Sequence, residues 1–448
     1  MDLRNKRVTV LGAARSGLDS ALFLKKNGAS VFLSEKKAEK LWAREKNILE
    51  KEGIGTEAGG HTDRVLEGAD IIVVSPGIPL NIPILEKAKA LNISIISEIE
   101  LASGFCPCPI IAIGGTNGKT TTTTLLGKVL KKTKTPVIVA GNIGTTFISQ
   151  INNLSSEHAA VLEISSFQLD GIKDFCPNIS ITLNITPDHL DRYSSMEAYI
   201  LAKQRILVNQ KKDDWTILNF DDEIVKLWDQ KTKAKVLFFS AKNEVAEGVY
   251  LKGDDIVFSC NGKAEKVCSR GDIRLLGGHN VSNILAVITA CKIKNVTNDI
   301  IKNTIKSFMG LAHRIEFVRE IEGVKFYNDS KGTTIDSVAK AIESFSNPII
   351  LIAGGQDKGL DFSILRNLVQ KRVRFLILIG EAKEKIRRAL DGTSVIYENN
   401  TLEDAVRKAK ELAVQGDVVL FSPGCASFDM FKDYKDRGNK FKKIINSI

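Results

Sequence analysis

Residues 110–121 read Ile-Ile-Ala-Ile-Gly-Gly-Thr-Asn-Gly-Lys-Thr-Thr, and this stretch decides the fold. Ile110–Ile113 is a short apolar run typical of a buried strand, and a helix is expected to begin near Lys119. Glycines between a strand and a helix let backbone N–H groups face phosphate oxygens, and the helix N-terminus adds positive potential. Lys119 would then reach the β- and γ-phosphates of a nucleotide, and the Thr120 hydroxyl would bind Mg²⁺. The usual spacing places a glycine where Ile113 stands, so the loop is a shortened variant.

Apolar strand-like runs alternate with amphipathic helical segments along most of the chain. The other runs are Arg7–Leu11, Ser30–Leu33, Ile71–Val74, Ala160–Ile164, Ser180–Leu183, Ile349–Ile352, Phe375–Ile379 and Val418–Phe421. Strands that are apolar at every position imply parallel sheets covered by helices on both faces. The pattern predicts an α/β fold, with one domain boundary near residues 97–109 and a second near Gly310. The expected domains are therefore residues 1–97, 98–310 and 311–448.

Composition excludes several classes of protein. The chain has 448 residues, of which 43% are hydrophobic and 26% charged, so it can bury several cores and is not disordered. No apolar run reaches the length of a membrane helix, and the first one is too short for a signal peptide. The seven cysteines are scattered, and the spacing of Cys106 and Cys108 does not suit zinc. We therefore expect a cytoplasmic protein.

The formal net charge of +10 has two interpretations. One is a nucleic-acid or membrane surface, and the other is a protein that handles small anionic ligands. Lysines and arginines are spread along the chain, and the densest cluster, at Lys131–Lys134, is typical of a helix C-terminus. Aromatic residues are only 6% and form no stripe with basic residues. We expect neither nucleic acid nor membrane as a partner.

Two segments after the glycine loop offer metal ligands. Glu163 follows an apolar run, and a carboxylate at the carboxyl end of a parallel strand points into the crevice where ligands bind. On this segment alone, Glu163 could equally be an ordinary surface acid at the end of a strand. His189 lies between Asp188 and Asp191, just past another strand. A histidine among acids, after a phosphate loop, is a candidate metal ligand.

Further polar segments have weaker signatures. Lys203 lies in a helical run over residues 197–208, where composition alone predicts an exposed lysine. Residues 12–17 resemble a dinucleotide-binding turn but have Ala14 where the middle glycine would stand, and Glu35 follows the next strand. Three loops rich in Ser, Thr and Lys follow later apolar runs, at Asn328–Thr334, Gly354–Lys358 and Ser422–Phe428. Together these loops suggest a second anion-binding surface, although each alone could be a polar turn.

Taken together, these motifs resemble the Mur ligase family, the ATP-dependent amide-bond-forming enzymes of peptidoglycan precursor synthesis. The stretches that carry the resemblance are Gly115–Thr120, Leu162–Leu169, Asn328–Thr333, Gly354–Gly359 and Ser422–Asp429, continuing to Arg437-Gly438. They follow the order and spacing of the family from about Gly12 to Phe441. Within the family they are most similar to the member that adds D-glutamate, and the Asp-Asn-Pro-Arg motif of the diamino-acid-adding member is absent.

The resemblance implies an α/β enzyme of three domains. A Rossmann-like N-terminal domain would bind the UDP part of UDP-N-acetylmuramoyl-L-alanine. A central P-loop ATPase-type domain would hold ATP and Mg²⁺, and a Rossmann-like C-terminal domain would bring D-glutamate. The reaction would pass through an acyl phosphate, with no protein nucleophile, in a cytoplasmic monomer.

The resemblance also implies roles for individual residues. ATP-binding roles fall on Gly115, Thr116, Asn117, Gly118, Lys119, Thr120, Thr121, Asn280, Asn283, Arg314 and Asp329. Substrate contacts fall on Ser16 and Glu35 at the uridine side, on Asn142, and on Lys331, Thr333, Lys358, Ser427 and Phe428 for D-glutamate. Metal-site roles fall on Thr120, Glu163, His189 and Lys203, and catalytic roles on Lys119, His189 and Lys203. Two Mg²⁺ sites are implied, with Lys203 carbamylated so that it becomes a metal ligand.

Three alternatives stay open at the level of sequence. One is another amide ligase on the same scaffold, such as a folylpolyglutamate synthetase, although Asn328–Thr333 and Ser422–Asp429 argue against it. A second is a nucleotide-binding switch without enzymatic activity, which would bind ATP without amino-acid-dependent turnover. A third is a nicotinamide oxidoreductase built on the turn at residues 12–17, which leaves the central glycine loop unexplained.

Overall fold

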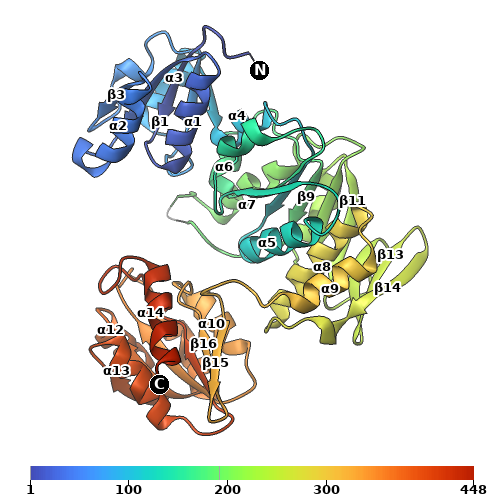
Figure 1. Cartoon of the computed structure of the whole chain (residues 1–448), viewed down its shortest axis with the longest axis vertical. Helices are drawn as coiled ribbons and strands as arrows, with labels where there is room; N and C mark the ends of the chain where they lie inside the picture. The colour runs from blue at the N-terminus through green and yellow to red at the C-terminus, as the bar shows by residue number, and fades with distance from the viewer. Residues whose placement is uncertain (1, 191) are drawn as a thin grey trace. The chain divides into compact units, whose positions relative to one another are not determined.

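The stretch that opens with Ile110 folds as a strand, a glycine loop and a helix, as its sequence predicts. Strand β6 spans Ile110–Gly114 and helix α5 spans Lys119–Leu130. They belong to a computed structural model that describes residues 2–190 and 192–448. The chain forms two compact units, both visible in Figure 1. Unit 1 comprises Met1–Ile273 and Ser282–Lys306, and unit 2 comprises Arg274–Val281 and Ser307–Ile448.

Unit 1 begins with a five-stranded parallel sheet in the order β3-β2-β1-β4-β5. Its strands are β1 (Arg7–Leu11), β2 (Ser30–Glu35), β3 (Gly55–Ala58), β4 (Ile71–Val74) and β5 (Ser94–Ser97), with helices α1 (Arg15–Lys26), α2 (Ala43–Lys51), α3 (Pro83–Ala90) and α4 (Glu98–Ser103). Alternate residues of β1 face opposite sides, so Val8 and Val10 join one core while Leu11 joins another. Helices therefore cover both faces, as the apolar strands predict.

The turn after β1 is shorter than the sequence predicts. Helix α1 begins at Arg15, so Ser16 lies on the helix and not in a turn. Gly12 adopts a φ of +92°, and a Cβ at Gly17 would collide with the Gly12 carbonyl oxygen. This close approach lets the chain enter the helix at once. Strand β2 in turn extends to Glu35, which ends the strand instead of following it.

The second sheet of unit 1 has nine strands, in the order β14-β13-β12-β11-β10-β9-β6-β8-β7. The strands are β7 (Val137–Gly141), β8 (Ala159–Glu163), β9 (Ile179–Thr182), β10 (Trp215–Asn219), β11 (Lys235–Ser240), β12 (Gly248–Lys252), β13 (Asp255–Cys260) and β14 (Lys263–Ser269), besides β6. The helices are α6 (Ser166–Asp170), α7 (Met196–Gln204), α8 (Gly278–Ile293) and α9 (Asn298–Ser307) in addition to α5, and α8 starts within unit 2. Strand β6 lies between β8 and β9, so three loops that bear polar residues meet at its carboxyl end.

One edge of this sheet departs from the predicted parallel arrangement. Strands β12, β13 and β14 pair antiparallel to one another. Asn261 and Gly262, with φ of 52° and 71°, reverse the chain between β13 and β14. An Asn-Gly pair with two positive φ values is the tight turn that suits the twist of a hairpin.

Unit 2 contains a six-stranded sheet in the order β15-β16-β20-β17-β18-β19. The strands are β15 (Glu316–Ile321), β16 (Val324–Asn328), β17 (Ile349–Gly354), β18 (Val373–Ile379), β19 (Val395–Glu398) and β20 (Val418–Phe421), and the helices are α10 (Ile335–Glu343), α11 (Arg366–Arg372), α12 (Lys383–Leu390), α13 (Leu402–Leu412) and α14 (Tyr434–Asn446). Among the described strands of this sheet, β15 and β16 form the one antiparallel pair, and the other pairs are parallel. Along β17, Ile349 and Leu351 join the core under α10–α12, while Ile350 and Ile352 join the core under α13 and α14. Both faces are buried, which explains why β17 is apolar at every position.

No helix within residues 2–190 and 192–448 is long and apolar enough to cross a bilayer.

Glu100 on α4 ties the first sheet of unit 1 to the second. Its carboxylate oxygens accept hydrogen bonds from the backbone N–H groups of Lys173, Asp174 and Phe175, each at 2.9 Å. The side chain is buried, so water cannot replace these bonds. A single carboxylate therefore satisfies three donors of the loop after α6.

Glu100→Ala should lower the free energy of unfolding by about 3 kcal/mol, because it leaves partly or fully buried N–H groups without an acceptor. Urea denaturation followed by circular dichroism measures the change. The exposed Glu157 serves as the matched control, and Glu157→Ala should change the stability by less than about 0.5 kcal/mol. Equal stability of the two variants would contradict this role of Glu100.

Candidate active site

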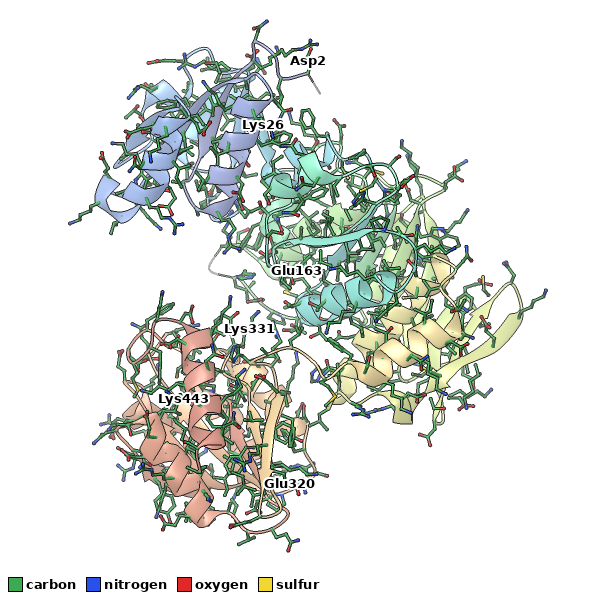
Figure 2. All side chains as sticks on the ribbon, in the orientation of Figure 1. Asp2, Lys26, Glu163, Glu320, Lys331 and Lys443 are labelled. Carbon is green, nitrogen blue, oxygen red and sulfur yellow. The ribbon has the colours of Figure 1, made fainter. Side chains whose placement is uncertain are left out.

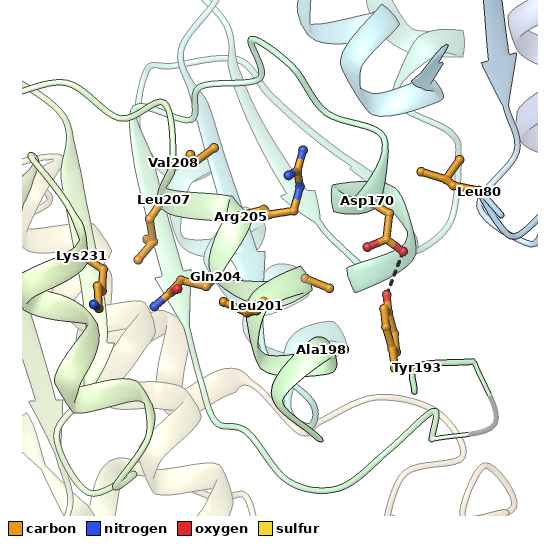
Figure 3. Close-up of a pocket in the computed structure, with 11 residues that line it drawn as sticks. Leu80, Asp170, Tyr193, Ala198, Leu201, Gln204, Arg205, Leu207, Val208 and Lys231 are labelled. Carbon is orange, nitrogen blue, oxygen red and sulfur yellow. Dashed lines mark hydrogen bonds between the residues drawn. The ribbon is translucent and has the colours of Figure 1, made fainter. Parts of the chain in front are cut away.

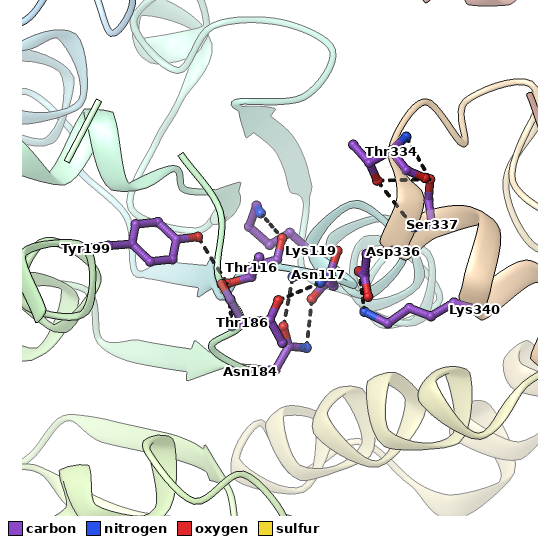
Figure 4. A network of polar contacts seen from close by, with 10 residues as sticks. All are labelled: Thr116, Asn117, Lys119, Asn184, Thr186, Tyr199, Thr334, Asp336, Ser337 and Lys340. Carbon is purple, nitrogen blue, oxygen red and sulfur yellow. Dashed lines mark hydrogen bonds and ion pairs between the residues drawn. The ribbon is translucent and has the colours of Figure 1, made fainter. Parts of the chain in front are cut away.

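The glycine loop after β6 is held by the segment that follows β9. The backbone N–H of Thr116 donates to the carbonyl oxygen of Asn184 at 2.8 Å, and the N–H of Asn117 donates to the Asn184 side chain at 2.8 Å. The Asn184 amide donates back to the Asn117 carbonyl at 3.1 Å. Figure 4 shows this exchange beside the start of α5. The loop conformation is thus set before any ligand binds.

Close packing explains the glycine at position 118. Gly118 has a φ of +86°, and a Cβ there would clash with the side-chain oxygen of Asn283 on α8. Thr116, on the other side of the loop, lies 3.0 Å from the Tyr199 hydroxyl and 3.2 Å from the Thr186 carbonyl oxygen. Helices α7 and α8 both contribute contacts to the loop, and residue 118 must stay a glycine.

Two lysines converge on one carbonyl oxygen of this loop. Lys119 donates to the Gly115 carbonyl at 2.9 Å and to the Thr116 carbonyl at 2.7 Å. Lys203 donates to the same Gly115 carbonyl at 2.8 Å. Because cations attract anions, this pair of amines suits an anionic ligand.

The expectation that Lys203 is an exposed helical lysine is wrong. Lys203 is only 5% exposed. It lies in the last turn of α7, which ends at Gln204 and is followed by a 3-10 turn over Arg205–Leu207. Burial, with Lys119 nearby, lowers the pKa of the Lys203 amine to about 7. Composition could not indicate this, because it does not tell which face of α7 packs against the glycine loop.

Glu163, labelled in Figure 2, ends β8 and is 3% exposed. One carboxylate oxygen accepts a hydrogen bond from the Asn142 side chain at 2.8 Å. The other, Oε2, is buried and has no hydrogen-bond partner among the described residues. A buried carboxylate oxygen without a donor is costly, and a hard cation such as Mg²⁺ would satisfy it. Glu163 is therefore a buried polar residue and not a surface acid.

His189 does not belong to a cluster of metal-binding side chains among the described residues. Its ring lies 4.7 Å from the Phe167 ring, and its Nε2 atom lies 3.5 Å from an oxygen of Asp188. Asp191 lies outside the described residues. In the part of the chain that is described, no three His, Cys, Asp or Glu side chains gather at metal-binding distance. A cation here would need oxygens from a ligand as well as from Glu163 and the half-buried Thr120.

At the first sheet, Glu35 braces the turn after β1. Its two carboxylate oxygens accept hydrogen bonds from the backbone N–H groups of Ala13, at 2.7 Å, and Lys37, at 2.9 Å. Ser16 lies half-buried in the first turn of α1. Arg15, its neighbour, donates to the carbonyl oxygen of Gly144, which lies two residues from Asn142. Ser16 and Asn142 are thus linked through neighbouring residues within unit 1.

In unit 2, Asp329 lies at the carboxyl end of β16. It accepts hydrogen bonds from the Ser422 hydroxyl at 2.7 Å and from the Ile315 N–H at 3.2 Å. Burial raises the pKa of the Asp329 carboxyl to about 7. Lys331 lies two residues after Asp329 in the same loop. Its amine is 5.5 Å from the centre of the Tyr434 ring.

The other predicted residues of unit 2 follow the same strand ends. Lys358 is exposed after β17, Thr333 is half-buried before α10, and Ser427 is buried after β20. Phe428 is 69% exposed, which is unusual for a large apolar side chain. These loops share one edge of the sheet, because parallel strands end together.

The four predicted nucleotide contacts outside the glycine loop fall in both units. Asn283 belongs to unit 1, whereas Asn280, Arg314 and Asp329 belong to unit 2. Asn280 donates to the Leu276 carbonyl at 2.7 Å, and Arg314 is exposed.

The sequence does not reveal the structural role of Arg437, although Arg437-Gly438 is part of the resemblance to the Mur ligase family. It is 1% exposed, and its guanidinium donates to the Ser330 hydroxyl and carbonyl oxygens at 3.0 and 2.8 Å. It also donates to the carbonyl oxygens of Cys425 and Ala426 at 3.1 and 3.0 Å. Arg437 therefore joins the loop after β16 to the loop after β20. Its position on α14 gives no local signal, because its partners are about 11 to 107 residues away.

Unit 1 also contains a pocket of about 600 Å³, which Figure 3 shows. Leu201, Gln204 and Val208 contribute to its lining, and Tyr193 there donates to Asp170 at 2.9 Å. Lys203 does not line it, so the pocket lies on a different side of α7 from the glycine loop. None of the predicted site residues belongs to its lining.

Comparison with protein families gives three matches along the chain. Residues 6–97 match the MurD-like N-terminal domain of Mur ligases, residues 113–291 the Mur ligase middle domain, and residues 313–425 the glutamate ligase domain of Mur ligases. Similar curated proteins carry the name UDP-N-acetylmuramoylalanine--D-glutamate ligase. Those of Caldicellulosiruptor bescii and Geotalea uraniireducens are 46% and 44% identical, over 100% of this chain and 99% of theirs.

Solved structures share the fold at lower identity. A pseudomurein peptide ligase type C from Methanothermus fervidus has a TM-score of 0.60 at 20% identity, over 99% of this chain and 100% of that one. MurF ligase from Thermotoga maritima, in complex with ADP, has a TM-score of 0.59 at 16% identity, over 100% and 99%. These likenesses extend over the whole three-domain α/β architecture.

Arg437→Lys should lower the free energy of unfolding by about 3 kcal/mol, because one ammonium cannot reach all four oxygens in a buried site. The matched control is Arg407→Lys, at an exposed position on α13, which should be nearly neutral. Chemical denaturation compares the two. If Arg437→Lys unfolds at the same denaturant concentration as the control, Arg437 does not hold the two loops together.

Proposed function

Because this chain belongs to the Mur ligase family, we propose that it joins D-glutamate to UDP-N-acetylmuramoyl-L-alanine with cleavage of ATP to ADP and phosphate, in peptidoglycan precursor synthesis. Curated relatives with this activity in their name match the chain over its whole length at 42% to 46% identity. The observation that carries the proposal is the glycine loop, with Lys119 and Lys203 on one carbonyl oxygen.

In the first step, the carboxylate of the muramoyl-alanine substrate attacks the γ-phosphate of ATP, so that an acyl phosphate forms and ADP leaves. The backbone of residues 115–121 holds the phosphates, and Lys119 leaves its carbonyl partners to neutralise the transferring group. Asn280, Asn283, Arg314 and Asp329 contribute contacts to the nucleotide. Positioning supplies much of the rate, because no protein nucleophile takes part.

Thr120, Glu163, His189 and Lys203 would hold Mg²⁺, in two sites. Mg²⁺ would supply positive charge beside the phosphates. The unpaired Oε2 of Glu163 supports its role as a ligand. An ammonium on Lys203 would repel the cation, whereas a carbamate on the same nitrogen would offer a carboxylate-like oxygen.

In the second step, the amine of D-glutamate attacks the activated carbonyl, and phosphate leaves. Lys331, Thr333, Lys358, Ser427 and Phe428 bind the amino acid. Two cations and two hydroxyls suit the two carboxylates of glutamate. The exposed Phe428 ring would exclude water when the amino acid is bound.

On the other substrate, Ser16 and Glu35 bind the uridine side, and Asn142 is a further substrate contact. We assign the domains to residues 1–97, 98–310 and 311–448. The enzyme acts as a cytoplasmic monomer that uses neither nucleic acid nor membrane.

Phosphate release with a panel of amino acids tests this function. With ATP, Mg²⁺ and UDP-N-acetylmuramoyl-L-alanine, D-glutamate should support turnover and L-glutamate should not, because the wrong chirality misplaces either the amine or the side-chain carboxylate. Equal rates with both enantiomers, or preference for a basic amino acid, would overturn the assignment.

Lys119→Ala should abolish turnover, with a loss of about 100-fold or more, because it removes a charge-assisted contact in the transition state. Circular dichroism should show that the variant is folded. The matched control is Lys131→Ala, just after α5, which should keep its activity because that lysine is exposed. Near-normal phosphate release by folded Lys119→Ala would exclude the proposed role of this residue.

Lys203→Ala should lose most activity, and a small carboxylic acid in the buffer should restore part of it by standing where the carbamate was. Carbamylation needs a neutral amine and CO₂. Since the pKa of Lys203 is lowered to about 7, the neutral fraction rises as pH increases through 7 and falls below it. Activation by bicarbonate should therefore be retained at pH 8 and lost at pH 6.

The exposed Lys211 provides the control. Lys211→Ala should have the same activity and the same response to bicarbonate as the protein without substitutions. Full activity of Lys203→Ala without added acid would rule out the carbamate.

A further inference from the structure

Two cysteines lie together where the chain passes from α4 to β6. All seven cysteines are free thiols. The sulfur atoms of Cys106 and Cys108 are 3.5 Å apart, within hydrogen-bond distance. A disulfide needs a separation of about 2.05 Å, so a shift of roughly 1.5 Å would bring the two into bonding contact.

The surroundings keep this pair in place. Phe105 packs edge-on against Phe23 of α1, with ring centroids 5.2 Å apart. Pro107 separates the two cysteines and Pro109 follows them, and each proline ring restricts the φ angle of its residue. Cys106 is half-buried, whereas Cys108 is buried in the core. Cys106 is thus the more exposed residue of the pair.

The hydrogen bonds of the pair make Cys106 the more acidic of the two. The contact between the two sulfur atoms lowers the pKa of Cys106 to about 7. The Cys106 thiol also donates to the Cys108 carbonyl oxygen at 3.3 Å. The pKa of Cys108 is raised by the contact between the sulfur atoms and by burial. Burial also raises the pKa of Cys176 to about 11 and that of Cys268 to about 12. Cys106 is therefore the thiol with the largest thiolate fraction among these four.

We propose that Cys106 and Cys108 form a dithiol site that low-molecular-weight disulfides oxidise to an intramolecular disulfide. The Cys106 thiolate attacks one sulfur of the oxidant RS–SR, forms a mixed disulfide and releases RS⁻, which takes up a proton. Cys108 then loses its proton to solvent and attacks the Cys106 sulfur, which expels the second RS⁻. The oxidant gains two electrons, and the two cysteines lose them.

The site is separate from the ligand-binding loops. Cys108 precedes the first residue of β6, and the glycine loop follows its last residue. At about 3.3 Å per residue, a five-residue strand separates the two by more than about 13 Å. The proposal therefore does not rest on the proposed ligase activity, and its test needs no substrate.

Treatment of the reduced full-length protein with oxidised glutathione, followed by thiol counting and peptide mapping, tests the proposal. Two of the seven thiols should disappear together, in one disulfide between residues 106 and 108. At pH 7, Cys106 should react roughly fivefold faster than an ordinary thiol, because its larger thiolate fraction outweighs its lower nucleophilicity. The rate should fall at pH 6.

Single variants separate the two roles. Cys108→Ser should stop at a glutathione adduct on Cys106, and Cys106→Ser should lose the fast reaction. Cys176→Ser, at another half-buried cysteine, should react like the protein without substitutions. The proposal would be overturned if Cys106 did not react, or if the other cysteines reacted equally fast. A stable glutathione adduct in the protein without substitutions would also overturn it.

Discussion

Two lysine amines share the carbonyl oxygen of Gly115, and one of them is buried. Two cations side by side repel each other, and burial adds to the cost of keeping both charged. The protein lowers this cost by letting Lys203 become neutral near pH 7. Glu163 lies at the end of β8, which pairs with β6. One of its carboxylate oxygens is buried and accepts no hydrogen bond from the described residues, which is also unfavourable. The amines of Lys119 and Lys203 and the unsatisfied oxygen of Glu163 support the proposal that phosphate and a metal ion bind here.

Much of the fold was predictable because its signals are local. The apolar run before the glycines, and the length of the helix after them, specify β6 and α5 without tertiary information. The antiparallel edge was missed, although the Asn261-Gly262 pair is a strong hairpin signal. The early start of α1 was missed for a different reason, since it depends on the contact between Gly12 and Gly17 and not on helix propensity.

The candidate site was predictable only in part. Residues that adjoin a strand end, such as Glu163 and Asp329, could be found because parallel strands gather their carboxyl ends. The burial of Lys203 could not, since it depends on which face of α7 contacts the glycine loop. Arg437 escaped for a similar reason, because its four acceptors come from two loops far away in sequence. Family resemblance supplied the roles that residue chemistry alone left open.

We propose that Glu163 and carbamylated Lys203 are ligands of the two metal sites beside the glycine loop. A crystal structure of the full chain with Mg²⁺ and a non-hydrolysable ATP analogue, grown with bicarbonate at pH 8, tests it most directly. We expect a metal ion on Oε2 of Glu163 and a carbamate on the Lys203 nitrogen, with the phosphates on residues 115–121. A nucleotide bound elsewhere, or an unmodified Lys203 still donating to Gly115 beside a metal-free Glu163, would contradict it.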